Sequence, residues 1–247
     1  MCRPLFAQWS ASSRLRPGHD GEMLFRAVFL PFTATSRRDL VERLVQLVGG
    51  LFLYGVALGF MVRGGIGVAP WDVLSLGVAR WTGLGYGLVT VLISIVVLLL
   101  WIPLRQRVGL GTLLNALLIG PFADLTLLVL PAPPSVWVGA PMFVFGLVLL
   151  AFATGLYIAA DFGPGPRDGL MTGLVRVTRW PVWLARTVIE GSVLLIGFLL
   201  GGPVGVGTVL FAFGVGPLIG WFLPRIERRR RERSQRLAVG ASAPLGP

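Results

Sequence analysis

Six long apolar segments limit what this chain can fold into more than any other feature of its sequence. Each approaches the ~20 residues that a helix needs to cross a bilayer. Only 13% of the residues are charged and the mean hydropathy is +0.80, whereas a soluble domain carries about 25% charged residues. The sequence therefore predicts an all-α polytopic membrane protein. The segments cover approximately residues 44–62, 85–104, 109–130, 136–158, 181–200 and 205–223.

Two shorter apolar segments, residues 70–81 and 166–179, lie between the long ones. They are too short to span comfortably, so we interpret them as re-entrant or half-helices. Such elements are tolerated at membrane depth where they are buried in protein or line a water-filled cavity. The expected fold is thus about six transmembrane helices plus two short helices.

The sequence repeats itself with an offset of 96 residues. The repeat is clearest in a glycine, a proline and an aspartate: Gly67/Gly163, Pro70/Pro166 and Asp72/Asp168. It continues without a gap through Arg80/Arg176, Gly109/Gly205, Gly111/Gly207, Thr112/Thr208, Gly120/Gly216 and Pro121/Pro217. Identities of these residue types are informative because apolar positions match by chance far more often. We infer an internal duplication.

Each unit holds three long segments, so the second unit enters the membrane from the opposite side, as in many secondary transporters. If the short elements cross the membrane as well, the repeats are parallel instead. The distribution of arginines favours two inverted-topology repeats, residues 36–130 and 131–224. We expect a disordered extension over residues 1–35 and a basic disordered cytoplasmic tail over residues 225–247.

All positive side chains are arginines, and the net charge is +11. They concentrate at the two ends of the chain, with a run from Arg225 to Arg236 directly after the last apolar segment. Such a run favours contact with anionic lipid on the cytoplasmic face over nucleic-acid binding, which needs a basic face on a folded module. We expect both termini to be cytoplasmic, and a second copy of the chain is a further candidate partner.

Cysteine and histidine occur once each, as Cys2 and His19. An intrachain disulfide is excluded, and the sequence gives no ligand cluster for a metal and no nucleophile paired with a histidine. The early glycines lack the strand–helix context of a dinucleotide fingerprint. We therefore expect no cofactor and no enzymatic activity.

Three stretches resemble the YczE/YitT-like family of bacterial integral membrane proteins. They are residues 65–72 (GIGVAPWD), 101–104 (WIPL) and 109–116 (GLGTLLNA), and the resemblance extends over about residues 40 to 224. It implies a polytopic protein of the bacterial cytoplasmic membrane. It implies no catalytic residues.

Asp72 and Asp168 are the first candidates for a functional site, because ionisable residues within a membrane are commonly functional. Two interpretations stay open. The carboxylates could bind a cation or relay protons at the midplane, or they could cap the two short helices, whose starts favour negative charge. The helix starts also present free N–H groups that suit an anion.

Arg80 and Arg176 lie eight residues after these aspartates, about 12 Å along a helix, and cannot pair with them within one element. Pairing across the repeats, Asp72 with Arg176 and Asp168 with Arg80, is a geometrically permitted hypothesis and would suit a gate. The alternative is that both arginines complement the dipole at their helix ends, and that Arg176 follows the excess of arginine on the cytoplasmic side.

The remaining candidates are polar, glycine or proline positions. Arg186 and Glu190 are spaced to neutralise each other on one helix, and the first repeat has Thr90 and Ser94 there, an asymmetry that would suit a selective site. Gly67 and Gly163 allow unusual backbone dihedrals, Pro70 and Pro166 suit helix starts, and Asn115 adds a polar group in the third span. The Gly120-Pro121 and Gly216-Pro217 pairs predict a kink or break.

The leading functional hypothesis is a transporter of a small molecule or ion, with its site between the two inverted repeats. The alternative is a non-transporting scaffold or accessory factor that assists another protein. A weaker third is a membrane enzyme that uses Asp72 and Asp168. Transport predicts a polar cavity between the repeats that is reached from one side only, whereas a scaffold predicts a dry, packed interface.

Overall fold

The computed structural model describes residues 37–242, and within this range the chain forms eight helices and no strand. The predicted extension over residues 1–35 lies outside the described residues. The all-helical fold class is confirmed. The helices are α3 (Arg37–Gly64), α4 (Pro70–Thr82), α5 (Tyr86–Trp101), α6 (Leu110–Val129), α7 (Val136–Ala159), α8 (Pro166–Thr178), α9 (Val182–Leu199) and α10 (Val206–Ser242).

Five of these helices are long and apolar enough to cross a membrane: α3, α6, α7, α9 and α10. A sixth span requires α4 and α5 together, which are bent by 115° at the break between them. α5 has 16 residues and is shorter than predicted. It ends at Trp101: Ile102 still has helical dihedrals, but Pro103 has no N–H with which to continue the helical hydrogen bonds. The two short helices, α4 and α8, have 13 residues each.

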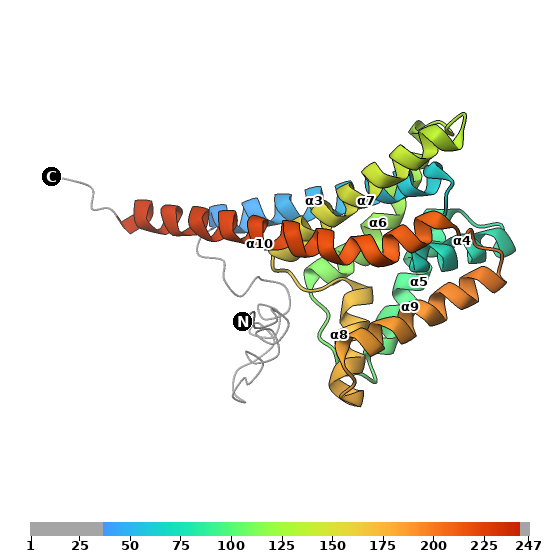
Figure 1. Cartoon of the computed structure of the whole chain (residues 1–247). Coiled ribbons are helices and arrows are strands. Elements are labelled where there is room, and N and C mark those ends of the chain that lie inside the picture. The colour runs from blue at the N-terminus through green and yellow to red at the C-terminus, as the bar shows by residue number, and fades with distance from the viewer. Residues whose placement is uncertain (1–36, 243–247) are drawn as a thin grey trace.

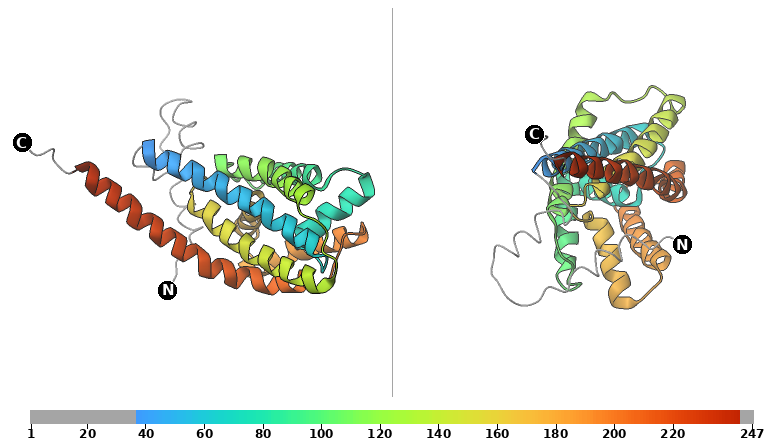
Figure 2. Two further views of the ribbon diagram at one scale, coloured as in Figure 1. Left: turned by 90° about the horizontal axis from the view of Figure 1, so that it is seen from above. Right: turned by 90° about the vertical axis from the view of Figure 1, so that its left-hand side faces the viewer.

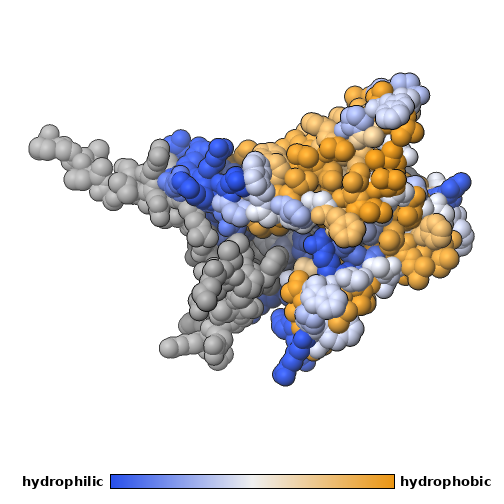
Figure 3. All heavy atoms as spheres, viewed as in Figure 1, coloured by the Kyte–Doolittle hydropathy of each residue, from blue (hydrophilic) through white to orange (hydrophobic). Residues whose placement is uncertain are grey.

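Three long helices, α3, α7 and α10, lie side by side along the long axis of the molecule (Figures 1 and 2). Leu47, Leu51 and Phe143 are completely buried in the core that α3 and α7 share with α6 and α10. α3 and α7 run antiparallel, since Gly50 near the start of α3 lies beside Tyr157 while Gly64 at its end lies beside Gly139. Apolar side chains cover much of the outer surface (Figure 3), as expected for a lipid-facing bundle.

Helices of the first half of the chain pack on helices of the second half in a reciprocal way. α4 packs on α9, and α5 packs on α8. The helices that exchange partners also correspond in sequence, because Pro70 and Pro166 begin α4 and α8 while Tyr86 and Val182 begin α5 and α9, each pair 96 residues apart. The repeat read from the sequence is therefore also a repeat of helix positions.

Backbone hydrogen bonds between the two halves form the same reciprocal pattern. The amide of Gly207 donates to the carbonyl of Ile66 over 2.7 Å, and the amide of Gly111 donates to the carbonyl of Phe162 over 2.9 Å. The two donors lie 96 residues apart in the sequence, and so do the two acceptors. Each half thus fastens the loop that precedes the other half's short helix.

The structure bears on two expectations for the third and last spans. Pro121 and Pro217 do not break their helices, since α6 and α10 continue through them; a kink at either proline stays a prediction. A disordered tail from residue 225 is also wrong for the part that the structure describes, because α10 continues as a helix to Ser242. Arginine is a good helix former, and Arg228 pairs with Glu232 one turn later at 2.8 Å.

The beginning of α3 and the end of α10 lie at the same end of the molecule (Figure 1). Arg233 of α10 pairs there with Glu42 of α3 at 3.2 Å. The next residue, Arg43, is 3% exposed and pairs with Asp39 one turn earlier at 2.9 Å and with Asp161 at 3.8 Å. This cluster of charges connects α3 to the loop that leads into α8.

Candidate functional site

The starts of the two short helices meet at the centre of the fold. Both are preceded by a glycine with a left-handed backbone, Gly67 with φ of 114° and Gly163 with φ of 110°. A Cβ on Gly67 would lie 2.8 Å from the amide nitrogen of Gly205, and one on Gly163 would lie 3.2 Å from the Thr112 hydroxyl. Only glycine combines this dihedral with such a close approach. As predicted, Pro70 and Pro166 each occupy a first helical position.

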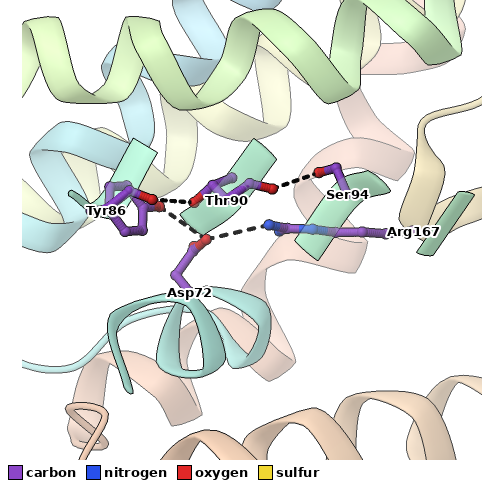
Figure 4. Close-up of polar contacts among 5 residues, drawn as sticks. All are labelled: Asp72, Tyr86, Thr90, Ser94 and Arg167. Atoms are coloured by element: carbon purple, nitrogen blue, oxygen red, sulfur yellow. Dashed lines mark hydrogen bonds and ion pairs between the residues drawn. The ribbon is translucent and has the colours of Figure 1, made fainter. Parts of the chain in front are cut away.

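Asp72 lies at this centre and its residue is 1% exposed. The Tyr86 hydroxyl donates to its Oδ1 over 3.1 Å, and the Arg167 Nη2 lies 3.5 Å from the same oxygen (Figure 4). The predicted pairing with Arg176 is therefore wrong. Asp72 makes no capping hydrogen bond, since Ala69 is the N-cap of α4 and the partners of the carboxylate are side chains of α5 and α8. Its place in the first turn of α4, with Arg80 in the last turn, agrees with the predicted match to the helix dipole.

Asp168 takes the corresponding place in α8 but has a different partner. The hydroxyl of Tyr157, on α7, donates to its Oδ2 over 2.7 Å. Arg80, the partner predicted from the sequence, instead donates to the carbonyl of Gly201 over 3.3 Å. Both arginines are directed to the far ends of the short helices, because eight helical residues separate each from its aspartate.

The contacts of Arg80 and Arg176 follow the exchange between the halves. Arg176 donates to the carbonyls of Leu104 and Arg105, the latter over 3.1 Å. Arg105 corresponds to Gly201, the acceptor used by Arg80, at the 96-residue offset. Arg80 also lines an open hollow of about 560 Å³ that contains Gly201 and Pro203. Both arginines thus fasten the ends of α4 and α8 to loops of the other half.

Arg167 is the candidate site residue that the sequence analysis does not identify. It pairs with Asp72, and its guanidinium lies 5.2 Å from the centre of the Trp71 ring, within cation–π range. Trp71 and Arg167 occupy the same position of the two repeats, so a residue of one half stacks on its own counterpart. A charged residue beside Asp168 at a helix start within an apolar chain was a signal that could have identified it.

All three tyrosines of the chain gather at this site. Tyr86 and Tyr157 each donate to one aspartate, and the Tyr54 ring lies 6.2 Å from that of Tyr157. Thr90 and Ser94 add hydroxyls from α5, which donate to carbonyls one turn earlier over 2.9 and 2.8 Å (Figure 4). The sequence offered no pattern that brings these tyrosines together, because they come from α3, α5 and α7.

A cavity of about 50 Å³ lies between these side chains. It has space for a few water molecules. Asn115, predicted as a polar candidate, lines it. The other lining residues are Tyr54, Thr90, Ser94, Ile119, Tyr157, Gly165, Pro166, Arg167 and Asp168. Both halves of the chain therefore contribute to one polar cavity next to a buried ion pair.

Arg186 and Glu190 form the predicted pair on α9 over 2.8 Å, with side chains 41% and 25% exposed. Arg186 lies near enough to Asp168 to interact with its charge. A metal centre has no support within residues 37–242, where no group of three or more His, Cys, Asp or Glu side chains converges.

Apolar helices of spanning length around buried charges define the class of this chain: it is an integral membrane protein. Residues 41–224 match a family of unknown function, DUF6198, and the chain belongs to this family. The chain is 42% identical to an uncharacterized protein of Haemophilus influenzae, over 74% of this chain and 84% of the relative.

Two proteins of Bacillus subtilis are also similar. The uncharacterized membrane protein YczE is 31% identical over 76% of this chain and 89% of its own length. The uncharacterized protein YyaS is 27% identical over 76% of this chain and 95% of its own length. The resemblance to YczE-like proteins inferred from the sequence is confirmed. A comparison with solved structures gives no match.

Proposed function

We propose that the two halves are inverted-topology repeats. Two observations support this. The long helices α3 and α7, which begin the two halves, are antiparallel neighbours. The contacts between the halves come in exchanged pairs, as a two-fold relation requires. If both helices span the bilayer, they cross it in opposite directions, which is what an inverted repeat means.

We further propose that the protein transports a small polar molecule or an ion through a site between these repeats. The observation that carries the proposal is the ion pair of Asp72 and Arg167, whose side chains are 1% and 24% exposed and which joins the two halves beside a polar cavity. Midplane sites between inverted repeats, built at the starts of discontinuous helices, are typical of secondary transporters.

Stability alone does not account for this ion pair. Transfer of a charge into a low-dielectric interior costs several kcal/mol per ion, and the attraction between the partners seldom exceeds that. Charged residues within the membrane are accordingly rare and mark pathways for substrates, ions or protons. Asp72, Asp168 and Arg167 are therefore our candidates for substrate binding, with Tyr157 and Asn115 beside them.

The scaffold hypothesis predicts a dry interface between the repeats. The polar lining of the cavity favours transport, and its volume of about 50 Å³ limits what it can hold in this conformation to a small solute or a few water molecules.

We also propose that both termini are cytoplasmic and that the end of α10 contacts anionic lipid. The ends of the described chain lie together, and arginines next to a span favour the cytoplasmic side. The Arg228 side chain is 82% exposed, which leaves it available to lipid phosphate.

A ligand screen by thermal unfolding tests the transport proposal. The purified full-length protein is heated with monovalent cations, carboxylates, amino acids and quaternary ammonium ions, each singly. At least one should stabilise the wild type, by about 2.7 kcal/mol at a hundred times its dissociation constant. The shift should vanish in Asp72→Asn or Asp168→Asn and persist in the exposed control Glu232→Gln.

Two outcomes would count against the proposal. Absence of stabilisation across the whole panel favours the scaffold. Equal stabilisation of the wild type and both aspartate variants places the ligand elsewhere.

A further inference from the structure

The two halves differ in how two of their helices pack: α5 packs closely on α6, whereas α9, the counterpart of α5, stands apart from α10, the counterpart of α6 (Figure 1). We call these two lines of contact the α5–α6 seam and the α9–α10 seam. Their residues correspond one to one at the 96-residue offset, so the two seams can be compared position by position.

The α5–α6 seam is closed by glycines and one carboxylate. Gly87 of α5 and Gly120 of α6 are buried, and each lies against the backbone of the other, with no room for a Cβ. The amide of Gly87 donates to Asp124 Oδ1 over 2.8 Å. Ala116, one turn before Gly120, is 2% exposed. The stripe Ala116–Gly120–Asp124 is therefore the surface on which α5 is seated.

The corresponding stripe on α10 is Ala212–Gly216–Gly220, and all three residues are exposed. A Cβ on Gly216 or Gly220 would meet nothing within 4 Å. Opposite them, Trp183 takes the place of Gly87, and its side chain is 68% exposed. The stripe keeps the small residues that allow two helices to approach closely, yet no helix of the described chain is seated on it.

The open seam also carries charge. Arg186 and Glu190 of α9 stand where the closed seam has Thr90 and Ser94, which are buried. Lipid chains cannot solvate an ion pair, so charged side chains in a spanning helix face protein or a water-filled cavity. Figure 3 shows hydrophilic surface in a hollow between two apolar regions. α9 also packs on α8, the helix that carries Arg167 and Asp168, so this route leads toward the cavity.

We propose that the α9–α10 seam is the hydrated access route to the Arg167–Asp168 cavity, and that it closes when α9 docks on the Ala212–Gly216–Gly220 stripe, less closely than α5 docks on α6 because Trp183 stands in the place of Gly87. The route admits hydrophilic solutes or ions, since an ion pair lines it. In the opposite conformation of the transporter, the α9–α10 seam is closed and the α5–α6 seam is open. The inference rests on the proposed transport function.

Thiol accessibility tests whether the route is hydrated. Ala212→Cys and Ala116→Cys form a matched pair, since both start from alanine at the same repeat position. Each is placed in a Cys2→Ser background and treated in membranes with a charged methanethiosulfonate. Ala212→Cys should react at least tenfold faster than Ala116→Cys. Equal rates, or an unreactive Ala212→Cys as expected for a lipid-facing stripe, would overturn the proposal.

Cross-linking tests closure without any knowledge of the substrate. Val91 Cγ2 lies 3.1 Å from the place where a Gly120 Cβ would be. Its counterparts are Thr187 and Gly216. Oxidation of Thr187→Cys/Gly216→Cys with copper phenanthroline should therefore join α9 to α10 within one chain. Thr187→Cys/Val215→Cys is the control and should not react, because Val215 is 2% exposed and faces the core.

The outcomes of cross-linking are distinct from those of the ligand screen. Failure of the Thr187–Gly216 disulfide, or a disulfide only between two chains, would refute closure by α9 even if a ligand binds. A disulfide within one chain supports closure even if the ligand panel contains no substrate.

Discussion

Replacement of Arg167 by methionine should destabilise the protein far more than the same replacement of an arginine in a more exposed ion pair. The substitution keeps most of the side-chain length and removes the charge. It leaves the Asp72 carboxylate, 1% exposed, with the Tyr86 hydroxyl as its remaining partner. A buried charge that loses its counter-ion is strongly unfavourable.

The magnitude follows from the geometry. Two unit charges 3.5 Å apart attract each other by about 5 kcal/mol at an effective dielectric constant of ~20. Breaking a buried pair by removal of one partner typically costs about 3–5 kcal/mol. The pair of Arg186 and Glu190 has side chains 41% and 25% exposed, and pairs of this kind contribute about 0–1 kcal/mol. Arg186→Met is therefore the matched control.

Unfolding in mixed micelles with increasing SDS, followed by tryptophan fluorescence, measures these differences. Arg167→Met should lower the free energy of unfolding by about 3–5 kcal/mol, and Arg186→Met by less than about 1 kcal/mol. The double variant Asp72→Asn/Arg167→Met removes both charges and should recover most of the loss. Equal losses for Arg167→Met and Arg186→Met, or no recovery in the double variant, would refute the reasoning.

Three further substitutions test separate contacts. Tyr157→Phe removes the donor to Asp168 and should reduce the free energy of unfolding by about 1.5–3 kcal/mol. The control Tyr54→Phe removes a hydroxyl with no hydrogen-bond partner among the described residues and should change this free energy little. Equal effects would contradict a stabilising hydrogen bond from Tyr157 to Asp168. Gly67→Ala should lower the free energy of unfolding by about 1–3 kcal/mol through its left-handed backbone, and further through the clash of its Cβ with Gly205. Gly49→Ala, where a Cβ meets no other atom, should be neutral or stabilising by up to about 1 kcal/mol, and equal effects of the two substitutions would contradict the role of Gly67. Asp124→Ala removes the acceptor of the Gly87 amide and should make Ala116→Cys reactive to a charged thiol reagent, while an unchanged rate would show that Asp124 does not hold the α5–α6 seam.

The elements of the fold were largely predictable from the sequence. Apolar length gave the long helices, and the recurrence of Gly67, Pro70 and Asp72 at a fixed offset placed both short ones. The prediction of disorder after residue 224 is wrong for the described residues. A basic run indicates disorder only where it cannot continue a helix, and here Arg228 pairs with Glu232 one turn later within α10. Local sequence therefore specified where most helices begin and end.

The partners at the site were less predictable. A repeat identifies equivalent positions, but it does not say which helices of the two halves touch. Symmetry permits a pairing of Asp72 with Arg176, whereas α4 meets the start of α8 and so brings Arg167 into reach. The roles of Tyr86 and Tyr157 depend on tertiary packing, since neither has a counterpart in the other repeat.

The side of the membrane on which two equivalent loop residues lie tests the account most directly. Arg107 and Pro203 are exposed and 96 residues apart. Each is replaced by cysteine in a Cys2→Ser background and labelled with a membrane-impermeant maleimide in intact cells and in inverted vesicles. Inverted repeats predict that Pro203→Cys reacts in cells and Arg107→Cys only in inverted vesicles. Labelling of both from the same side would contradict the inverted repeat and, with it, the proposed transport site.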